Sequence, residues 1–506
     1  MRTAGDRLWI ALDGPRLTSE DDELLREVEP GGIVLFRRNI ESAEQVRALV
    51  EALRNRLGAG LHVVVDQEGG AVTRFERECT VFPGNLTLGA LAANDRSEAL
   101  ALARQWGRVS GRELASLGID GNLAPVLDLT VRSDNPGIGC RSFGADPALV
   151  GELAVELAAG HHEEGVFTVA KHFPGLGAAD LDTHLALPRI PPGDESRHLE
   201  PFAVAIAGGI PAVMTAHLIH EGLDPDAPAT ASRTVVDEVL RGRLGFAGVA
   251  MTDALEMGAV GEHPIEARVE AAVRAGHDVL CLCHGREAML RARRHLDAIG
   301  AGEDAMVSAR LAELPRLRGA GGPIDGAAVA TRIAEGGVTL LRQGAAPIPI
   351  PPGERWLLIL PAPRGLTPAE DPLRAEDLLP FAELLGERVE CLLVSSEPTS
   401  EELARAATRS IERDGILLAT LGLPASEARR QLLLSAVEWN PRLCVIHLGD
   451  PGELARLPRQ DFTVLTAYGY RRPHQEALAR VLRGELVPSG RWPAPPQVRG
   501  ELGLGP

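Results

Sequence analysis

The segment VFTVAKHFPG, residues 166–175, decides the fold class of this chain. Its first five residues form a continuous apolar and β-branched run, which is typical of a strand buried on both faces of a parallel sheet. Lys171 and His172 follow directly, and Pro174 and Gly175 then provide turn chemistry. The segment therefore predicts a buried strand with polar side chains at its carboxyl end.

Similar apolar runs recur through the first three hundred residues, separated by segments with apolar residues three and four apart. Counting the segment above, there are eight such runs, and the other seven are LWIALDG (8–14), GGIVLF (31–36), LHVVVDQEGG (61–70), IDGNLAPVLDL (119–129), PAVMTAHL (211–218), FAGVAMTDAL (246–255) and HDVLCLCHG (277–285). Eight strand–helix repeats over about 290 residues predict a (β/α)8 barrel of the TIM type.

The chain is long enough for a second unit after the barrel. Residues 1–318 are assigned to a (β/α)8 barrel, residues 319–336 to a linker with a helix, and residues 337–506 to a smaller α/β sandwich of the doubly wound type. The last unit is predicted from five further apolar runs: RWLLILPAP (355–363), ERVECLLVSS (387–396), DGILLATLG (414–422), PRLCVIHLG (441–449) and DFTVLTAYG (461–469).

Charge and composition exclude several classes of partner. The formal net charge is −18, which argues against nucleic acid or an anionic membrane surface and favours a small or uncharged ligand. The first residues, MRTAGDRLWIALDG, lack the pattern of a secretory signal, and no run of about 18 apolar residues predicts a membrane span. The six cysteines are scattered through a long chain, which is more typical of reduced thiols than of a disulfide framework. We therefore expect a cytoplasmic protein. The oligomeric state is left open.

Polar residues gather at the predicted carboxyl ends of five strands, the rim where barrel active sites are assembled. They are Asp66, Asp128, Lys171 with His172, His217 and Asp253. Lys171 is the only lysine among the 52 lysines and arginines. An ammonium is smaller than a guanidinium, so a site that needs a compact cation would explain its presence.

Two further patterns have both a structural and a chemical interpretation. Asp182 and His184 are two residues apart in a loop, where a carboxylate can orient an imidazole as general acid and base, although an ordinary Asx-type loop is the alternative. Asp253 is either a helix cap or a carboxylate that points into the cleft.

Cys281, Cys283 and His284 lack a second cysteine pair at zinc spacing, so we expect no metal and no cofactor.

Charged residues in two loops complete the candidate site. Asp66 and Arg74 belong to VVVDQEGGAVTRF, and Arg141 belongs to NPGIGCRSFG. Such groups can bind a polyhydroxylated ligand through charge-assisted hydrogen bonds.

Four motifs, taken in their order along the chain, carry a resemblance to a known family. They are DQEGG (66–70), RSFG (141–144), KHFPG with a downstream D-x-H-x-x-LP (171–188), and TDALEMGA (252–259). Together they resemble glycoside hydrolase family 3, in particular its bacterial β-N-acetylglucosaminidase (β-N-acetylhexosaminidase) branch, and the resemblance extends over the whole chain.

The resemblance implies a retaining exo-β-N-acetylglucosaminidase that acts on muropeptide or chitooligosaccharide fragments, as in peptidoglycan recycling. It implies that Asp253 is the nucleophile and that His184, held by Asp182, is the acid and base. The resemblance also implies that five residues contact the sugar: Asp66, Arg74, Arg141, Lys171 and His172. The chain departs from the family pattern at Leu176 (usually His), Ala71 (usually Arg) and Cys140 (usually Asp), all next to pocket loops.

Other functions stay open at this point. A GlcNAc-specific phosphorylase is one, because a neutral imidazole does not repel phosphate as a carboxylate would. Another family 3 β-glycosidase is a second. A barrel aldolase that uses Lys171 as a Schiff-base amine, or a sugar-binding protein without catalysis, are less favoured.

Overall fold

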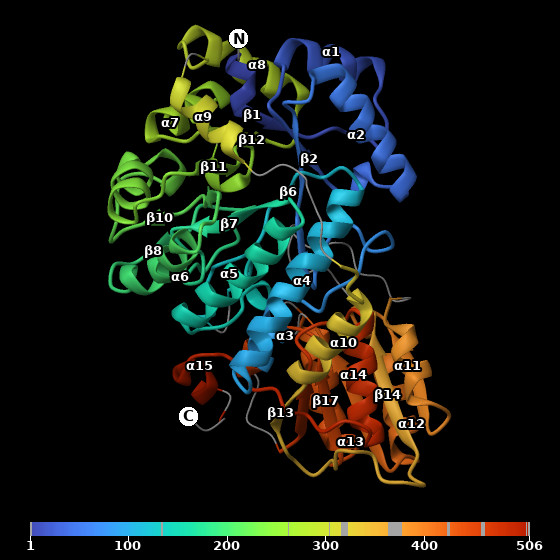
Figure 1. Cartoon of the computed structure of the whole chain (residues 1–506). Coiled ribbons are helices and arrows are strands. Elements are labelled where there is room, and N and C mark those ends of the chain that lie inside the picture. Colours follow the sequence, from blue (N-terminus) through green and yellow to red (C-terminus); the bar gives the residue numbers. More distant parts are fainter. Residues whose placement is uncertain are drawn as a thin grey trace.

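The structure is a computed structural model that describes residues 3–132, 135–261, 263–302, 304–314, 322–362, 377–421, 426–456, 461–501 and 503. It has a closed barrel at one end and a six-stranded sheet at the other (Figure 1). No helix in these ranges is both long and apolar enough to cross a membrane.

Eight parallel strands close the barrel in the order β1-β12-β11-β9-β7-β6-β3-β2. One strand lies in each of the eight apolar runs, so the predicted barrel is confirmed. The strands are β1 (Leu8–Ile10), β2 (Gly32–Leu35), β3 (His62–Val65), β6 (Gly121–Asn122), β7 (Phe167–Phe173), β9 (Ala212–Thr215), β11 (Val249–Ala254) and β12 (Val279–Leu282).

Amphipathic helices cover the outside of the barrel. The helix α2 (Ala43–Leu57) shows why: Ser42 caps its first turn by accepting the Gln45 N–H, and Val46, Leu49, Val50 and Leu53 bury one face at helical spacing. The other helices of this layer are α1 (Ser19–Val28), α4 (Arg96–Ser116), α5 (Pro147–Glu163), α6 (Glu195–Ala207), the π-helix η5 (Thr234–Arg243), α7 (Ile265–Ala275) and α8 (Arg286–Ala298). The helix α9 (Ala305–Glu313) instead packs Val307 and Leu311 against the interior cluster that contains Trp9.

Aromatic side chains fill the amino-terminal end of the barrel. Trp9 stacks on His62 at 5.6 Å between ring centroids and meets Phe167 at 6.2 Å. Two glycines make room for these rings, since a Cβ on Gly32 would lie 2.6 Å from the Trp9 ring and one on Gly121 would lie 2.3 Å from the Phe167 ring. The polar residues at the opposite strand ends are therefore left to face a cavity.

The second sheet has the order β13-β18-β17-β16-β14-β15 and is parallel except for β13, which pairs antiparallel with β18. Its strands are β13 (Thr339–Arg342), β14 (Trp356–Pro361), β15 (Val389–Val394), β16 (Gly415–Thr420), β17 (Leu443–His447) and β18 (Thr463–Thr466). Its helices are α11 (Leu379–Leu385), α12 (Ser400–Ile411), α13 (Glu427–Trp439) and α14 (Arg472–Arg483). The parallel strands lie in the five predicted runs, and β13 adds an edge strand. We call this sheet with its helices the second domain.

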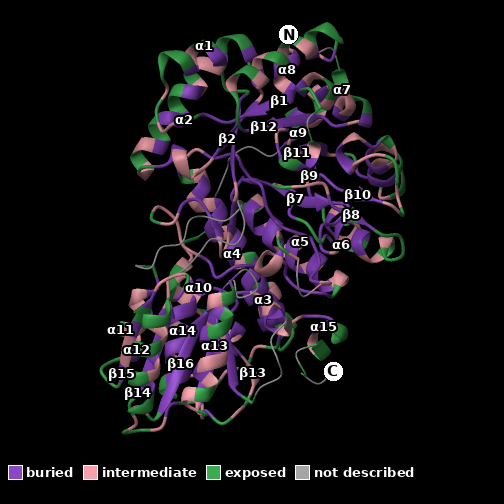
Figure 2. Ribbon diagram, turned by 180° about the vertical axis from the view of Figure 1, so that it is seen from behind, coloured by how far each residue is buried: buried purple, intermediate pink, exposed green. Residues whose placement is uncertain are grey.

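Two helices lie at the junction between the barrel and the second domain (Figure 1). They are α3 (Asn85–Ala92), which is buried on all sides, and α10 (Gly326–Gly337). Figure 2 shows that α3 and the strands of both units are largely buried, whereas α10 also has exposed residues. The proposed boundary at residues 318/319 lies outside the described residues, so the domain limits stay predictions.

Candidate active site

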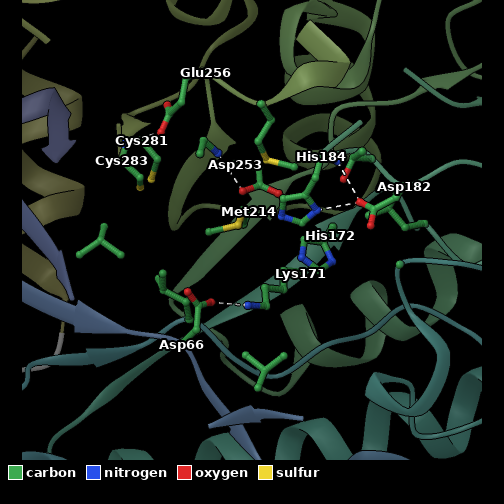
Figure 3. Close-up of a pocket in the computed structure, with 18 of the residues that line it drawn as sticks. Asp66, Lys171, His172, Asp182, His184, Met214, Asp253, Glu256, Cys281 and Cys283 are labelled. Atoms are coloured by element: carbon green, nitrogen blue, oxygen red, sulfur yellow. Dashed lines mark hydrogen bonds and ion pairs between the residues drawn. The ribbon is translucent and has the colours of Figure 1, made fainter. Parts of the chain in front are cut away.

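A cavity of about 970 Å³ opens at the carboxyl ends of the barrel strands. Figure 3 shows charged side chains from several strands and loops converging on it. The structure brings all the nominated residues into its lining: Asp66, Arg74, Arg141, Lys171, His172, Asp182, His184 and Asp253. Asp128 and His217, which the strand-end pattern grouped with them, are fully buried behind the lining.

Asp253 lies in β11 and points into this cavity (Figure 3). Its Oδ1 accepts the Ala254 N–H at 2.7 Å. Burial alone would raise the pKa of the Asp253 carboxyl, but the neighbouring His217, His172 and His184 and the Ala254 N–H together hold this pKa below its usual value. Asp253 is therefore a half-buried carboxylate that is kept ionised at the cavity wall.

His217 supports this carboxylate from behind. Its Nε2 lies 2.9 Å from the Ala254 carbonyl oxygen, which can only accept, so this ring nitrogen carries the hydrogen. Its Nδ1 lies 2.7 Å from the Thr230 hydroxyl. Burial lowers the pKa of His217, and the nearby Asp253 carboxylate opposes this shift. Through its contact with the Ala254 carbonyl, the ring orients the end of β11.

Asp182 and His184 form a close pair in the loop between β7 and β8 (Arg189–Ile190). One carboxylate oxygen, Asp182 Oδ1, accepts the His184 backbone N–H at 2.9 Å and lies 2.7 Å from the ring Nδ1. Burial opposes ionisation of Asp182, but these contacts with His184 lower its pKa overall. Because the carboxylate fixes the hydrogen on Nδ1, Nε2 is the nitrogen that can exchange a proton with a ligand.

Backbone hydrogen bonds dock this loop on the segment that follows Asp253. The Gly258 N–H donates to the His184 carbonyl at 3.2 Å, and the Ala259 N–H donates to the Thr183 carbonyl at 3.0 Å. A Cβ at Gly258 would lie 2.6 Å from the His184 oxygen, so the approach needs glycine. The imidazole of His184 is thereby held over the cavity that contains the Asp253 carboxylate (Figure 3).

A buried ion-pair network forms another wall of the cavity. Lys171 Nζ lies 2.6 Å from Asp66 Oδ1 and 2.7 Å from Glu68 Oε1. Glu68 in turn accepts two hydrogen bonds from the Arg141 guanidinium, at 2.8 and 2.9 Å. Two carboxylates balance two cations, and we call these four residues the floor network.

The floor network favours the charged states of Glu68 and Lys171. Burial would raise the pKa of Glu68, but Arg141 and Lys171 bring it far below its usual value. Burial would lower the pKa of Lys171, but Asp66 and Glu68 raise it overall. A Lys171 held as an ammonium between two carboxylates cannot act as a nucleophilic amine, which argues against Schiff-base chemistry.

Glu68 also lines the cavity, although it was not predicted from the sequence. It is 3 % exposed and connects the two cations of the floor network. The signal was present in DQEGG, because residues two apart in an extended segment share a side. Asp66 and Glu68 could therefore have been assigned together to the cation at Lys171.

His172 is oriented by Asp128. His172 Nδ1 lies 2.7 Å from Asp128 Oδ2, and the other carboxylate oxygen accepts the Leu176 N–H at 2.6 Å. The ring Nε2 then lies 3.5 Å from an Arg141 nitrogen. Asp128 thus acts through His172 instead of facing the cavity itself.

The cysteines next to the site do not form a metal centre with their neighbours. Cys281 and Cys283 line the cavity, and burial raises the pKa of both thiols well above its usual value. His284 Nδ1 contacts Glu256 Oε1 at 3.2 Å. Among the described residues, no group of three histidine, cysteine or acidic side chains is arranged to hold a metal ion.

The burial of the floor network leads to a prediction about the free energy of unfolding. Glu68→Gln is expected to lower the free energy of unfolding by about 3 kcal/mol or more, because it leaves buried cations short of a carboxylate. Glu152→Gln is the matched control, since it breaks an exposed pair with Arg96 and should cost less than about 1 kcal/mol. Urea unfolding of both variants measures the difference, and equal small shifts would contradict the buried-pair argument.

Comparisons with known proteins show the family to which this chain belongs. Residues 7–313 match the family model described as "Glycosyl hydrolase family 3 N terminal domain". A protein named "Beta-hexosaminidase" from Alkalilimnicola ehrlichii is 41% identical over 293 residues, which cover 57% of this chain and 84% of that protein.

Two solved structures are similar over different shares of the chain. A family 3 β-N-acetylglucosaminidase from Paenibacillus sp. str. FPU-7 has a TM-score of 0.88 and 31% identity, covering 97% of this chain and 98% of its own. NagZ from Neisseria gonorrhoeae, in complex with N-trifluoroacetyl-D-glucosamine, has a TM-score of 0.58 and 31% identity, covering 65% of this chain and 98% of its own. On the family model and the curated relative together, the chain is a glycoside hydrolase and belongs to glycosyl hydrolase family 3.

Proposed function

We propose that this enzyme is a retaining exo-β-N-acetylglucosaminidase that releases terminal β-linked GlcNAc through a covalent glycosyl-enzyme. The observation that carries the proposal is the placement of an ionised Asp253 and a carboxylate-held His184 in one cavity. The similar proteins named β-hexosaminidase and β-N-acetylglucosaminidase support the choice of sugar.

In the first step of the proposed mechanism, the Asp253 carboxylate attacks the anomeric carbon of the bound sugar. His184 donates a proton from Nε2 to the departing glycosidic oxygen as the C–O bond breaks. Asp182 stabilises the imidazolium before this transfer and keeps the hydrogen of Nδ1 in place.

In the second step, the neutral His184 takes a proton from water, and the resulting nucleophile attacks the anomeric carbon. The bond to Asp253 breaks, the free sugar leaves with its original β configuration, and His184 is again an imidazolium. The enzyme returns to its starting protonation state.

The floor network is proposed to bind the hydroxyls of the terminal sugar, together with Arg74 and His172. Lys171 suits this role because its ammonium has three donors and two are already directed at Asp66 and Glu68. A guanidinium would be too large for this buried space. We propose fragments of peptidoglycan or chitin in the cytoplasm as the natural substrates, consistent with six free cysteines.

A panel of aryl β-glycosides, assayed with and without phosphate, tests the proposal. We expect cleavage of the GlcNAc substrate well above the glucose and GalNAc analogues, and β-GlcNAc as the first product by NMR. First release of the α-anomer would overturn the retaining mechanism, and preference for glucose would overturn the sugar assignment. Formation of GlcNAc 1-phosphate would establish the phosphorylase alternative.

A further inference from the structure

The hairpin that carries Glu68 extends from the barrel toward the second domain. It is formed by β4 (Gln67–Gly69) and β5 (Val72–Thr73), and Arg74 follows it directly. Its turn uses Gly69 and Gly70 at φ values of 85° and 59°, which favour glycine. Whatever fixes this turn therefore also fixes Glu68 and Arg74 in the cavity wall.

Arg471, at the start of α14 in the second domain, holds this turn. Its Nε donates to the Gly70 carbonyl at 2.7 Å, and its Nη1 forms an ion pair with Glu76 just beyond the hairpin. The Arg471 side chain is 12% exposed. A planar guanidinium with two fixed donor directions can hold a carbonyl and a carboxylate at once.

Two of the three departures from the family pattern lie where the second domain touches the site loops. Ala71, where an arginine is usual, packs against the hydrophobic core of the second domain that contains Tyr470. Cys140, where an aspartate is usual, packs against the neighbouring core with Tyr468 and Trp492. A charged side chain at either position would lie against apolar groups of the second domain, where its desolvation is unfavourable.

The loop that carries Arg141 has a second link to this domain through α3. Asn85 Nδ2 donates to the Arg141 carbonyl at 2.6 Å, and two residues along the helix the Thr87 hydroxyl donates to the Ala467 carbonyl at 2.9 Å. The hairpin and the Arg141 loop then meet at the cavity through the Glu68–Arg141 pair. Both loops are thus attached to the second domain on one side and to each other on the other.

We propose that the second domain braces the floor network and that Arg471 is a positioning residue for the reaction. It does not touch the substrate; it acts through Gly70 on Glu68, and through Glu68 on Lys171 and Arg141. This role rests on the function proposed above, because it concerns the same cavity. Small displacements of groups that bind the reacting sugar cost large factors in rate, so a brace of this kind matters for turnover.

Arg471→Ala tests the brace, with Arg480→Ala as the matched control. Arg480 lies on the same helix and pairs with Glu335 of α10, away from the hairpin. We expect Arg471→Ala to lower kcat/KM for an aryl β-GlcNAc by about 10- to 100-fold and to accelerate hydrogen exchange in residues 67–74. Arg480→Ala should leave both quantities within about twofold of wild type. Arg471→Lys, which keeps one donor and the charge, should recover part of the loss.

The outcomes separate the two proposals. If the wild type does not cleave the GlcNAc substrate, the proposed function fails, while the exchange measurement still tests the brace. Equal losses of activity and of Tm in both alanine variants would show that Arg471 is an ordinary contact and would overturn the brace. Should Arg471→Ala not fold, Ala71→Arg provides a second variant, because it places a long charged side chain between the same turn and the core of the second domain. Unchanged kcat/KM and exchange in that variant would overturn the brace as well.

Discussion

Replacing Asp253 with alanine is expected to lower kcat for an aryl β-N-acetylglucosaminide by about 10⁴-fold or more. The covalent step needs a carboxylate, and the cavity places this one, already ionised, beside His184. Steady-state kinetics with a 4-nitrophenyl substrate measures the loss. Binding of GlcNAc, followed by calorimetry, should persist because the floor network is intact.

The space left by Asp253→Ala offers a positive test of the same assignment. Azide is small enough to enter it and attack from the face that the carboxylate used, so added azide should restore turnover and yield the α-glycosyl azide. Glu256 provides the control carboxylate, because it lines the same cavity and accepts a hydrogen bond from the Cys283 N–H. Glu256→Gln should lower kcat far less than Asp253→Ala does. Substantial turnover by Asp253→Ala without azide would remove the nucleophile assignment.

Replacing His184 with alanine is expected to have an effect that depends on the leaving group. For a poor leaving group such as phenol, kcat/KM should fall by about 10²- to 10⁴-fold, because the departing oxygen needs a proton. For 2,4-dinitrophenol, which leaves without protonation, kcat/KM should change little, although kcat falls when water is no longer activated. A series of aryl β-GlcNAc substrates of graded leaving-group pKa measures this difference.

The neighbouring acidic residues provide matched controls for the histidine. Asp182→Asn removes the carboxylate that holds Nδ1 and should reproduce part of the His184→Ala pattern. Asp180→Asn changes an exposed acid two residues earlier on the same loop and should have little effect. If the His184→Ala losses were the same for all leaving groups, the acid role would be wrong.

The barrel could be predicted because its information is local. Each strand lies in a short apolar run. The extent of a helix such as α2 can be predicted from the spacing of its apolar residues and from the serine that caps it. The run IDGNLAPVLDL predicts a full strand, yet β6 covers only Gly121–Asn122. Pro125 lacks the N–H that the ladder needs, and pairing continues only as an isolated bridge between Val126 and Lys171.

The site was only partly predictable, because a residue's position at the end of a strand does not determine the direction of its side chain. Asp128 and Asp253 both lie at the ends of predicted strands, but Asp128 holds His172 from behind and Asp253 faces the cavity. Glu68 shows the opposite limit: it lies two residues from Asp66 in the same motif, but it was not assigned to the site. The contacts of Ala71 and Arg471 join segments four hundred residues apart, about which local patterns carry no information.

The single lysine has a practical consequence for handling the protein. Lys171 is 2% exposed, and its nitrogen is engaged by two carboxylates. Acylating reagents aimed at side-chain amines therefore meet a single amine, which is held as an ammonium at the cavity wall. Reaction at this position would report that its ion pairs with Asp66 and Glu68 had opened, which makes the residue a chemical probe of the intact site.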